Sequence, residues 1–256
     1  MVTQSETANL ETAVSIAQAA GRLLVQLRND AGSMDPKLLR DKADAAAQEL
    51  IVSQLEIEDG YALLSEEGVD NTDRLAAQRV WIVDPLDGTW EYGQGRADFG
   101  VHIALWDMAE QRMVLGVVDL PEQGLTRTSA DPNPTLAPLP TERPIRIVAS
   151  RNRPPAELDA IVTRLGEKLD YPVEVVNVGS VGAKVNEILM GRAEAYLHDT
   201  GFYEWDLAAP QAVAHHYGLV LSHWDQTQVV YNLMPPFVKN VFVAHPDLAA
   251  DLQAVL

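Results

Sequence analysis

The chain has 256 residues, 47% of them hydrophobic, which is enough to bury the core of one large domain or two small ones. Its 19 Lys and Arg and 37 Asp and Glu give a formal net charge of −18, so we expect neither a nucleic-acid polymer nor a membrane among its partners. The absence of cysteine excludes disulfide scaffolds, thiolate zinc sites and cysteine nucleophiles. A polar N-terminus and the lack of a run of about 18 apolar residues predict a cytoplasmic protein.

The first part of the chain predicts two helices followed by strands. Apolar residues recur at helical spacing over 10–27, and Thr3 with Glu6 forms a capping-box pattern ahead of them. The Asp-Pro pair at 35–36 is typical of a helix N-terminus and predicts a second helix over 36–55. Strands are predicted at 62–64, 79–84, 101–106 and 113–118. Together, these helices and strands favour helices packed over an antiparallel sheet, which is an α+β arrangement.

The segment 131–144 contains five prolines, which neither a helix interior nor a central strand tolerates. We therefore expect a division of the chain into residues 1–140 and 141–256. The second half alternates strands and helices, so the fold class is α/β, with an α+β N-terminal half and an α/β C-terminal half. Its strands are predicted at 145–149, 173–178, 193–197, 219–221 and 241–244, and its helices at 155–169, 179–190, 206–217 and from 246 onwards.

The most informative motif is Asp84-Pro-Leu-Asp87-Gly-Thr89, which follows a predicted buried strand. A turn of this length can direct both carboxylates at one point, where they repel each other unless a cation or a proton neutralises them. Oxygen ligands favour a hard ion such as Mg²⁺. Gly88 lets the backbone approach a ligand closely, so the amides of Gly88 and Thr89 can hold phosphate oxygens. The alternative is an ordinary surface turn, because Asp-Pro and Asp-Gly pairs are common in turns.

Two further acidic sites favour the metal interpretation. Glu66 and Glu67 follow a short apolar strand, where a carboxylate projects from the end of a sheet. Asp206 lies at the start of an Ala-rich helix, where it serves as an N-cap residue or belongs to an anion-binding helix N-terminus. Taken singly, each site is equally well explained as a solvated turn or a helix cap.

In combination, Glu66-Glu67, Asp84-Pro-Leu-Asp87-Gly-Thr89 and Trp205-Asp206-Leu-Ala-Ala209 resemble the three signature motifs of the inositol monophosphatase superfamily. Members of this superfamily are Mg²⁺-dependent, lithium-sensitive phosphomonoesterases. The resemblance implies a layered αβαβα sandwich of the inositol monophosphatase and fructose-1,6-bisphosphatase type. It also implies that residues 1–140 carry the metal-binding motifs and that residues 141–256 complete the substrate site.

The resemblance implies a role for each matching residue. Asp44 would partner the Thr89 hydroxyl to orient or deprotonate the attacking water, and Glu66 would complete the catalytic set. The residues around Asp44 depart from the family's Val-Thr-rich pattern, and the alternative for Asp44 is an exposed helix carboxylate. The metal ligands would be Glu66, Asp84, Leu86 through its carbonyl, Asp87 and Asp206. The substrate-binding residues would be Glu66, Leu86, Asp87, Gly88, Thr89 and Asp206.

The charges of this implied site predict more than one metal ion. Its four carboxylates contribute −4 and a phosphate monoester adds about −2, so two or three Mg²⁺ are plausible and one is not. Two ions can activate the water and stabilise the leaving oxygen. No protein nucleophile is required, so we expect direct attack by water with inversion at phosphorus.

Within the superfamily, the chain is most similar to CysQ-type 3'(2'),5'-bisphosphate nucleotidases. The similarity rests on Glu91 shortly after the Thr89 motif, on Glu204 before Trp205, and on the Val178–Lys184 segment. Such enzymes convert adenosine 3',5'-bisphosphate to AMP and phosphate, which clears a by-product of sulfate assimilation. Inositol-1-monophosphatase and fructose-1,6-bisphosphatase activities remain the alternatives.

The residues themselves add little about the substrate. Phe202, Tyr203 and Trp205 offer a face on which adenine can stack, with ordinary packing as the alternative. Lys184 and Arg151 can meet a second phosphate, although exposed cationic side chains are common. The expected partner is a small phosphorylated substrate, and the resemblance allows a homodimer.

Two other classes compete with this interpretation. A haloacid-dehalogenase-type phosphatase also places an Asp pair before Gly-Thr, but with one residue between the aspartates rather than two, and it forms an aspartyl-phosphate. A metal- or phosphate-sensing module would keep the pocket without turnover.

Overall fold

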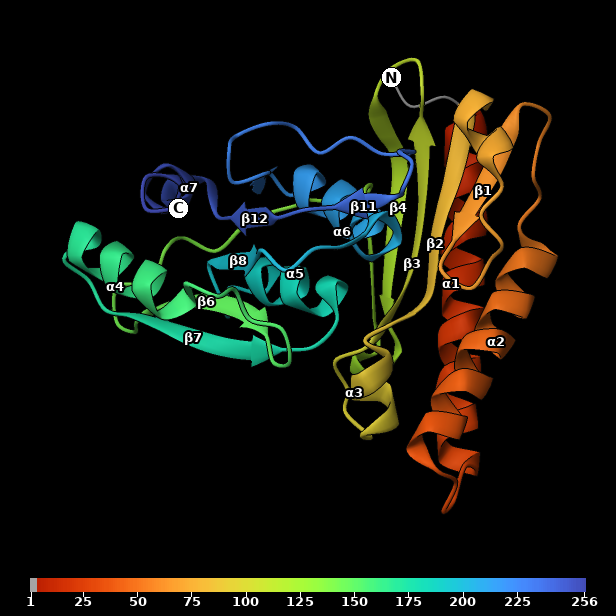
Figure 1. The fold of residues 1–256 in the computed structure, drawn as a ribbon, viewed down its shortest axis with the longest axis horizontal. Coiled ribbons are helices and arrows are strands. Elements are labelled where there is room, and N and C mark those ends of the chain that lie inside the picture. Colours follow the sequence, from red (N-terminus) through yellow and green to blue (C-terminus); the bar gives the residue numbers. More distant parts are fainter. Residues whose placement is uncertain (1–3) are drawn as a thin grey trace.

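The computed structural model describes residues 4–256 and shows five layers in the order helix, sheet, helix, sheet, helix (Figure 1). The layered αβαβα sandwich implied by the motifs is therefore confirmed. Thr3, one half of the predicted capping box, lies outside the described residues. From one side to the other, the helical layers contain α1 (Gln4–Asp30) and α2 (Pro36–Gln54), then α5 (Val181–Leu189) and α6 (Glu204–His216), then α4 (Leu158–Leu169) and α7 (Pro246–Gln253).

The first sheet separates two hydrophobic cores, because successive side chains of its strands face opposite sides. Trp81 and Val83 pack toward α1 and α2, whereas Val80 and Ile82 pack toward α5 and α6. The five strands are hydrogen-bonded in sequence order. They are β1 (Tyr61–Ser65), β2 (Arg79–Asp87), β3 (Gly100–Asp107), β4 (Arg112–Leu120) and β5 (Leu125–Thr128).

The second sheet has the order β10-β12-β8-β6-β7, and β6 pairs in parallel with both β7 and β8. Its outer face forms a third core with α4 and α7. Its strands are β6 (Ile145–Ser150), β7 (Val173–Val178), β8 (Ala195–His198), β10 (Val220–Ser222) and β12 (Val241–Ala244). Shorter elements are α3 (Thr89–Gly93), β9 (Phe202–Tyr203), β11 (Phe237–Val238) and the 3-10 turns Thr72–Ala76 and Pro121–Gln123.

Several sequence predictions need correction. The first sheet is not wholly antiparallel, because β1 and β2 pair in parallel. The connection over 66–78 is long enough to return the chain to the same end of the sheet, which a tight hairpin cannot do. Strand β2 continues past residue 84 to Asp87, with an irregular register between Asp84 and Asp87. The helix predicted from 155 begins at Leu158.

Other predictions are confirmed. The Asp35 carboxylate accepts hydrogen bonds from the amides of Lys37 and Leu38 and so caps α2. The proline-rich segment 131–144 forms neither helix nor strand. Within residues 4–256, no helix combines the length and the apolar character that crossing a membrane requires.

Candidate active site

The end of β2 delivers the first two acidic side chains. Asp84 continues the face of Val80 and Ile82, so its carboxylate points into the layer that contains α6. One oxygen of Asp84 accepts the Leu86 amide at 3.0 Å, which tightens the bend toward Asp87. Gly88 then adopts a φ of +87°, and a Cβ there would lie 3.0 Å from the Asp98 carbonyl, so glycine is required.

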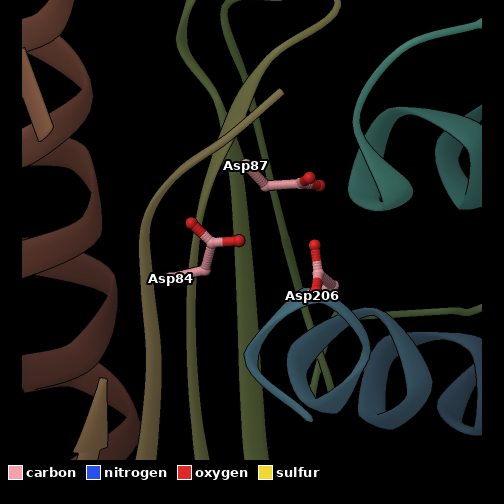
Figure 2. Close-up of side chains that lie close together, drawn as sticks. All are labelled: Asp84, Asp87 and Asp206. Carbon is pink, nitrogen blue, oxygen red and sulfur yellow. The ribbon is translucent and has the colours of Figure 1, made fainter. Parts of the chain in front are cut away.

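The third acidic side chain comes from the start of α6. The Asp206 carboxylate accepts the backbone N–H of Tyr203 at 2.8 Å. Because α6 begins at Glu204, Asp206 lies in the first helical turn rather than at the N-cap, which corrects the sequence prediction. This position projects its carboxylate toward β2 (Figure 2).

These three side chains converge. Asp84, Asp87 and Asp206 each offer a carboxylate oxygen, and the three oxygens lie within 4.8 Å of one another (Figure 2). Glu66 joins them because β1 runs parallel to β2, and its amide donates to the Val83 carbonyl at 3.2 Å. Although Glu66 is an exposed residue, it lines the same cavity as Asp84, Asp87 and Asp206. The structure thus brings together four of the five acidic residues in the three motifs: Glu66, Asp84, Asp87 and Asp206.

The electrostatics of this cluster fit a cation. Burial, followed by the charges of Glu66, Asp87 and Asp206, raises the pKa of Asp84 well above its usual value. Burial and the Asp87 charge raise the pKa of Asp206 to about 8, and mainly desolvation of its carboxyl raises the pKa of Glu66 to about 7. Protonation or a hard, oxygen-binding cation would relieve this repulsion, and an all-carboxylate donor set suits Mg²⁺.

Asp87 also anchors the N-terminus of α5. Its Oδ2 accepts the Ser180 hydroxyl at 2.6 Å and the Val181 amide at 2.6 Å. The same oxygen lies 3.3 Å from Nε2 of the fully buried His102. A residue of the first sheet therefore holds the start of a helix that also lines the site.

Asp44 and Thr89 lie near this cluster but are not paired. Asp44 is buried on α2, and its Oδ1 has no hydrogen-bond partner. Burial, then the charge of Glu67, raises the pKa of Asp44 to about 7. The exposed helix carboxylate considered as the alternative for Asp44 is therefore wrong. The Thr89 hydroxyl donates to the Leu86 carbonyl at 3.1 Å, which is the oxygen implied as a metal ligand.

A cavity of ≈ 230 Å³ is lined by the acidic cluster and by Lys184 and Arg153, two side chains here called the cationic wall. Lys184 lies on that wall and is buried, with Nζ 5.2 Å from the centre of the Tyr196 ring. Burial lowers the pKa of Lys184 to about 8, so it still carries its charge near neutral pH. Arg153 lies on the same wall. The residues lining the cavity are Glu66, Asp84, Leu86–Glu91, Ser150, Asn152, Arg153, Gly179–Val181, Lys184, Tyr196, His198, Phe202 and Asp206.

The comparison with known proteins decides the family. The profile of the inositol monophosphatase family matches residues 5–256. The chain belongs to the inositol monophosphatase family. Membership places it among the phosphoric monoester hydrolases.

Relatives within the inositol monophosphatase family include named nucleotidases. A 3'-phosphoadenosine 5'-phosphate phosphatase of Mycobacterium leprae is 38% identical over 99% of this chain and 95% of its own length. The 3'(2'),5'-bisphosphate nucleotidase CysQ of Escherichia coli K12 is 29% identical over 91% of this chain and 98% of its own length. The crystal structure of CysQ from Bacteroides thetaiotaomicron superimposes with a TM-score of 0.80 at 25% identity and covers 93% of this chain and 97% of that one. The predicted similarity to CysQ-type members of the family is therefore confirmed.

The arginine that lines the cavity is not the one that the sequence predicts. The sequence predicts Arg151 at a second phosphate, but its guanidinium donates to the carboxylates of Glu91 and Asp98. Arg153, two residues further along, lines the cavity in its place. The loop after a parallel strand is a common location for ligand-binding residues, but that signal applies equally to Arg151 and Arg153. Of the three aromatic residues, Phe202 lines the cavity, whereas Tyr203 and Trp205 stack on each other with ring centres 4.6 Å apart.

Proposed function

We propose that the chain is a Mg²⁺-dependent 3'(2'),5'-bisphosphate nucleotidase that hydrolyses adenosine 3',5'-bisphosphate to AMP and phosphate. The observation that carries this proposal is the cavity that Asp84, Asp87 and Asp206 line together with Lys184 and Arg153. A substrate with two phosphates matches both groups of side chains, because one phosphate needs a cation at the carboxylates and the other can pair with the cationic wall. The names of the relatives from Mycobacterium leprae and Escherichia coli support the same substrate.

The protein side of the mechanism is electrostatic positioning. We assign Glu66, Asp84, Asp87, Asp206 and the Leu86 carbonyl as ligands of two or three Mg²⁺. Bound Mg²⁺ would offset the negative charge of the phosphate and make a bound water more acidic. The backbone at Gly88 and Thr89 would hold the phosphate oxygens, since the left-handed turn at Gly88 keeps the chain close to the cavity.

Asp44 is proposed as the group that accepts a hydrogen bond or a proton during the reaction. Its unpartnered Oδ1 and its pKa of about 7 suit proton transfer near neutral pH. The proposed partnership with Thr89 requires the Thr89 hydroxyl to leave the Leu86 carbonyl, to which it now donates.

A substrate panel tests the proposed function. With Mg²⁺, we expect a higher kcat/KM for adenosine 3',5'-bisphosphate than for inositol 1-phosphate or fructose 1,6-bisphosphate. Chelation should remove the activity, and Li⁺ should inhibit it. Asp84→Asn should abolish hydrolysis, because it removes a charge from the cluster, while circular dichroism shows a retained fold.

Each contrary result has a distinct meaning. A higher kcat/KM for inositol 1-phosphate would remove the nucleotidase assignment but keep the phosphatase. Trapping a phosphorylated Asp84 would replace direct water attack by aspartyl-phosphate chemistry. No Mg²⁺-dependent turnover of any phosphomonoester would favour a sensing module.

A further inference from the structure

Arg151 connects the two halves of the chain beside the cavity. It follows β6 of the second sheet, yet its guanidinium donates to Glu91 Oε1 at 2.7 Å and to Asp98 Oδ2 at 2.9 Å, both in the first half. A third hydrogen bond, of 3.1 Å, reaches the Asn177 carbonyl at the end of β7. These are charge-assisted contacts in the fork geometry that arginine provides and lysine does not.

The acidic partners of Arg151 also hold the turn that enters α5. Asp98 Oδ2 accepts the Gly179 amide at 2.8 Å, and the Asp98 carbonyl accepts the Ser180 amide at 3.1 Å. Glu91 packs directly on Gly179, since a Cβ at that position would lie 2.4 Å from Glu91 Cγ. Arg151, Glu91 and Asp98 therefore form one network, here called the Arg151 clamp, around the 177–180 turn.

Both cationic groups of the cavity belong to segments that this clamp fixes. Arg153 is two residues after Arg151 on the same loop. Lys184 lies on α5, and its ammonium donates to the carbonyl of Gly179. The acidic cluster depends less on the clamp, because Asp87 holds the first amides of α5 through its own hydrogen bonds.

We propose that Arg151 is a positioning residue that sets Arg153 and Lys184 at the distance from the acidic cluster that a second phosphate requires. The inference rests on the proposed function, since it assumes that the cationic wall meets the phosphate that is not hydrolysed. Arg151 does not touch the substrate in this role. It acts through Glu91 and Asp98, and its loss should weaken recognition of a bisphosphate more than it slows hydrolysis.

The test compares two nucleotides that differ only in the second phosphate. For Arg151→Met, we expect KM for adenosine 3',5'-bisphosphate to rise about tenfold, which corresponds to the loss of one charge-assisted interaction. The kcat/KM for adenosine 3'-monophosphate should stay within about twofold, because the acidic cluster keeps its own support. Arg146→Met is the matched control: it removes the 2.6 Å ion pair between Arg146 and Glu174 on the same sheet and should change neither value.

Two further variants keep the test decisive. If Arg151→Met folds poorly, Arg151→Lys keeps the charge but lacks the planar fork that donates to each carboxylate from a separate nitrogen, and KM for the bisphosphate should still rise. Glu91→Gln combined with Arg151→Met should raise KM no further than Arg151→Met alone, because both changes break one clamp. If the increases in KM from Arg151→Met and Glu91→Gln multiply in the double variant, Glu91 acts on the substrate directly, which contradicts the inference.

The possible failures are distinguishable. Equal losses for both nucleotides would show a merely structural role for Arg151 and overturn the inference. If both Arg151 variants keep the wild-type preference for the bisphosphate, the inference is also overturned. The proposed function is not affected by that result. A wild-type protein without that preference would contradict the proposed function itself.

Discussion

At the scale of single residues, the fold keeps the carboxylates of the acidic cluster close together although their negative charges repel one another. Asp84 is buried, and both its burial and the neighbouring carboxylates raise its pKa. Such an arrangement costs stability when all groups are ionised, and the cost falls when a cation or a proton joins them. The cluster should therefore link folding stability, pH and Mg²⁺.

The pH dependence of the metal-free protein has a definite sign. The pKa of Asp206 rises from 3.8 to about 8 on folding, and that of Glu66 rises from 4.5 to about 7. The folded state thus keeps protons that the unfolded state has released, so the contribution of these two groups to stability is fully present below the unfolded pKa values and is lost as the pH rises to about 8. We expect Mg²⁺ to raise Tm more at pH 8 than at pH 5, as measured by thermal scans with and without the ion.

Asp84→Asn provides the control for this prediction. It removes one of the repelling charges, so the metal-free variant should lose less stability between pH 5 and pH 8 than the wild type does. An equal gain in Tm from Mg²⁺ at both pH values would show that the carboxyls are already ionised without a metal, contrary to their raised pKa values.

The acidic cluster and the cationic wall differ in how far the sequence alone could predict them. Asp84 and Asp87 belong to one short motif, and strand alternation explains why Asp84 faces α6. Arg151 and Arg153 differ by two positions on one loop, and only the placement of Glu91 and Asp98 decides which of them is free. Periodicity carries no such information in a loop, because each side chain there is directed by tertiary contacts.

At the scale of elements, regular periodicity predicted the long helices and strands, but pairing depends on connections. The parallel pairing of β1 with β2 follows from the 66–78 connection and leaves no signature within either strand. Strands β9 and β11 have two residues each, which is too short for any alternation to show. Helix α6 is the element that most needs accurate placement, because it carries Asp206 across to β2.

The close packing of α6 on β4 yields a stability prediction. Gly116 lies on β4, and a Cβ there would be 2.5 Å from Cβ of Ala212 and 2.9 Å from the Ala209 carbonyl, both on α6. Gly116→Ala must push α6 away, and we expect it to lower the free energy of unfolding by about 1–3 kcal/mol. It should also weaken the stabilisation by Mg²⁺, since Asp206 moves with α6. Denaturant titrations with and without Mg²⁺ measure both effects.

Gly166→Ala is the matched control within a helix. A Cβ at Gly166 on α4 would meet its nearest neighbour, the Tyr171 carbonyl, at 3.4 Å. Alanine should therefore stabilise α4 by about 0.5–1 kcal/mol, because it lowers the entropy that folding must remove. A Gly116→Ala protein as stable as the wild type would mean that α6 has room to shift, and that its contact with β4 does not fix Asp206.

At the scale of the whole molecule, the central core belongs to both halves of the chain. Helices α5 and α6 lie between the two sheets (Figure 1). The core around them combines Val80 and Ile82 of β2 with Leu207 of α6 and Val148 of β6. Separating the two proposed halves, 1–140 and 141–256, would expose the inner faces of both sheets to water.

This shared core predicts that the two proposed halves, 1–140 and 141–256, unfold in a single cooperative transition. Calorimetry should show one peak whose calorimetric and van't Hoff enthalpies agree. Mg²⁺ should move that peak as a whole, because Asp84 and Asp87 come from one half and Asp206 from the other. Two peaks, with only one responding to Mg²⁺, would instead mean that each half is stable by itself and that the ligands from one half alone suffice to bind the ion.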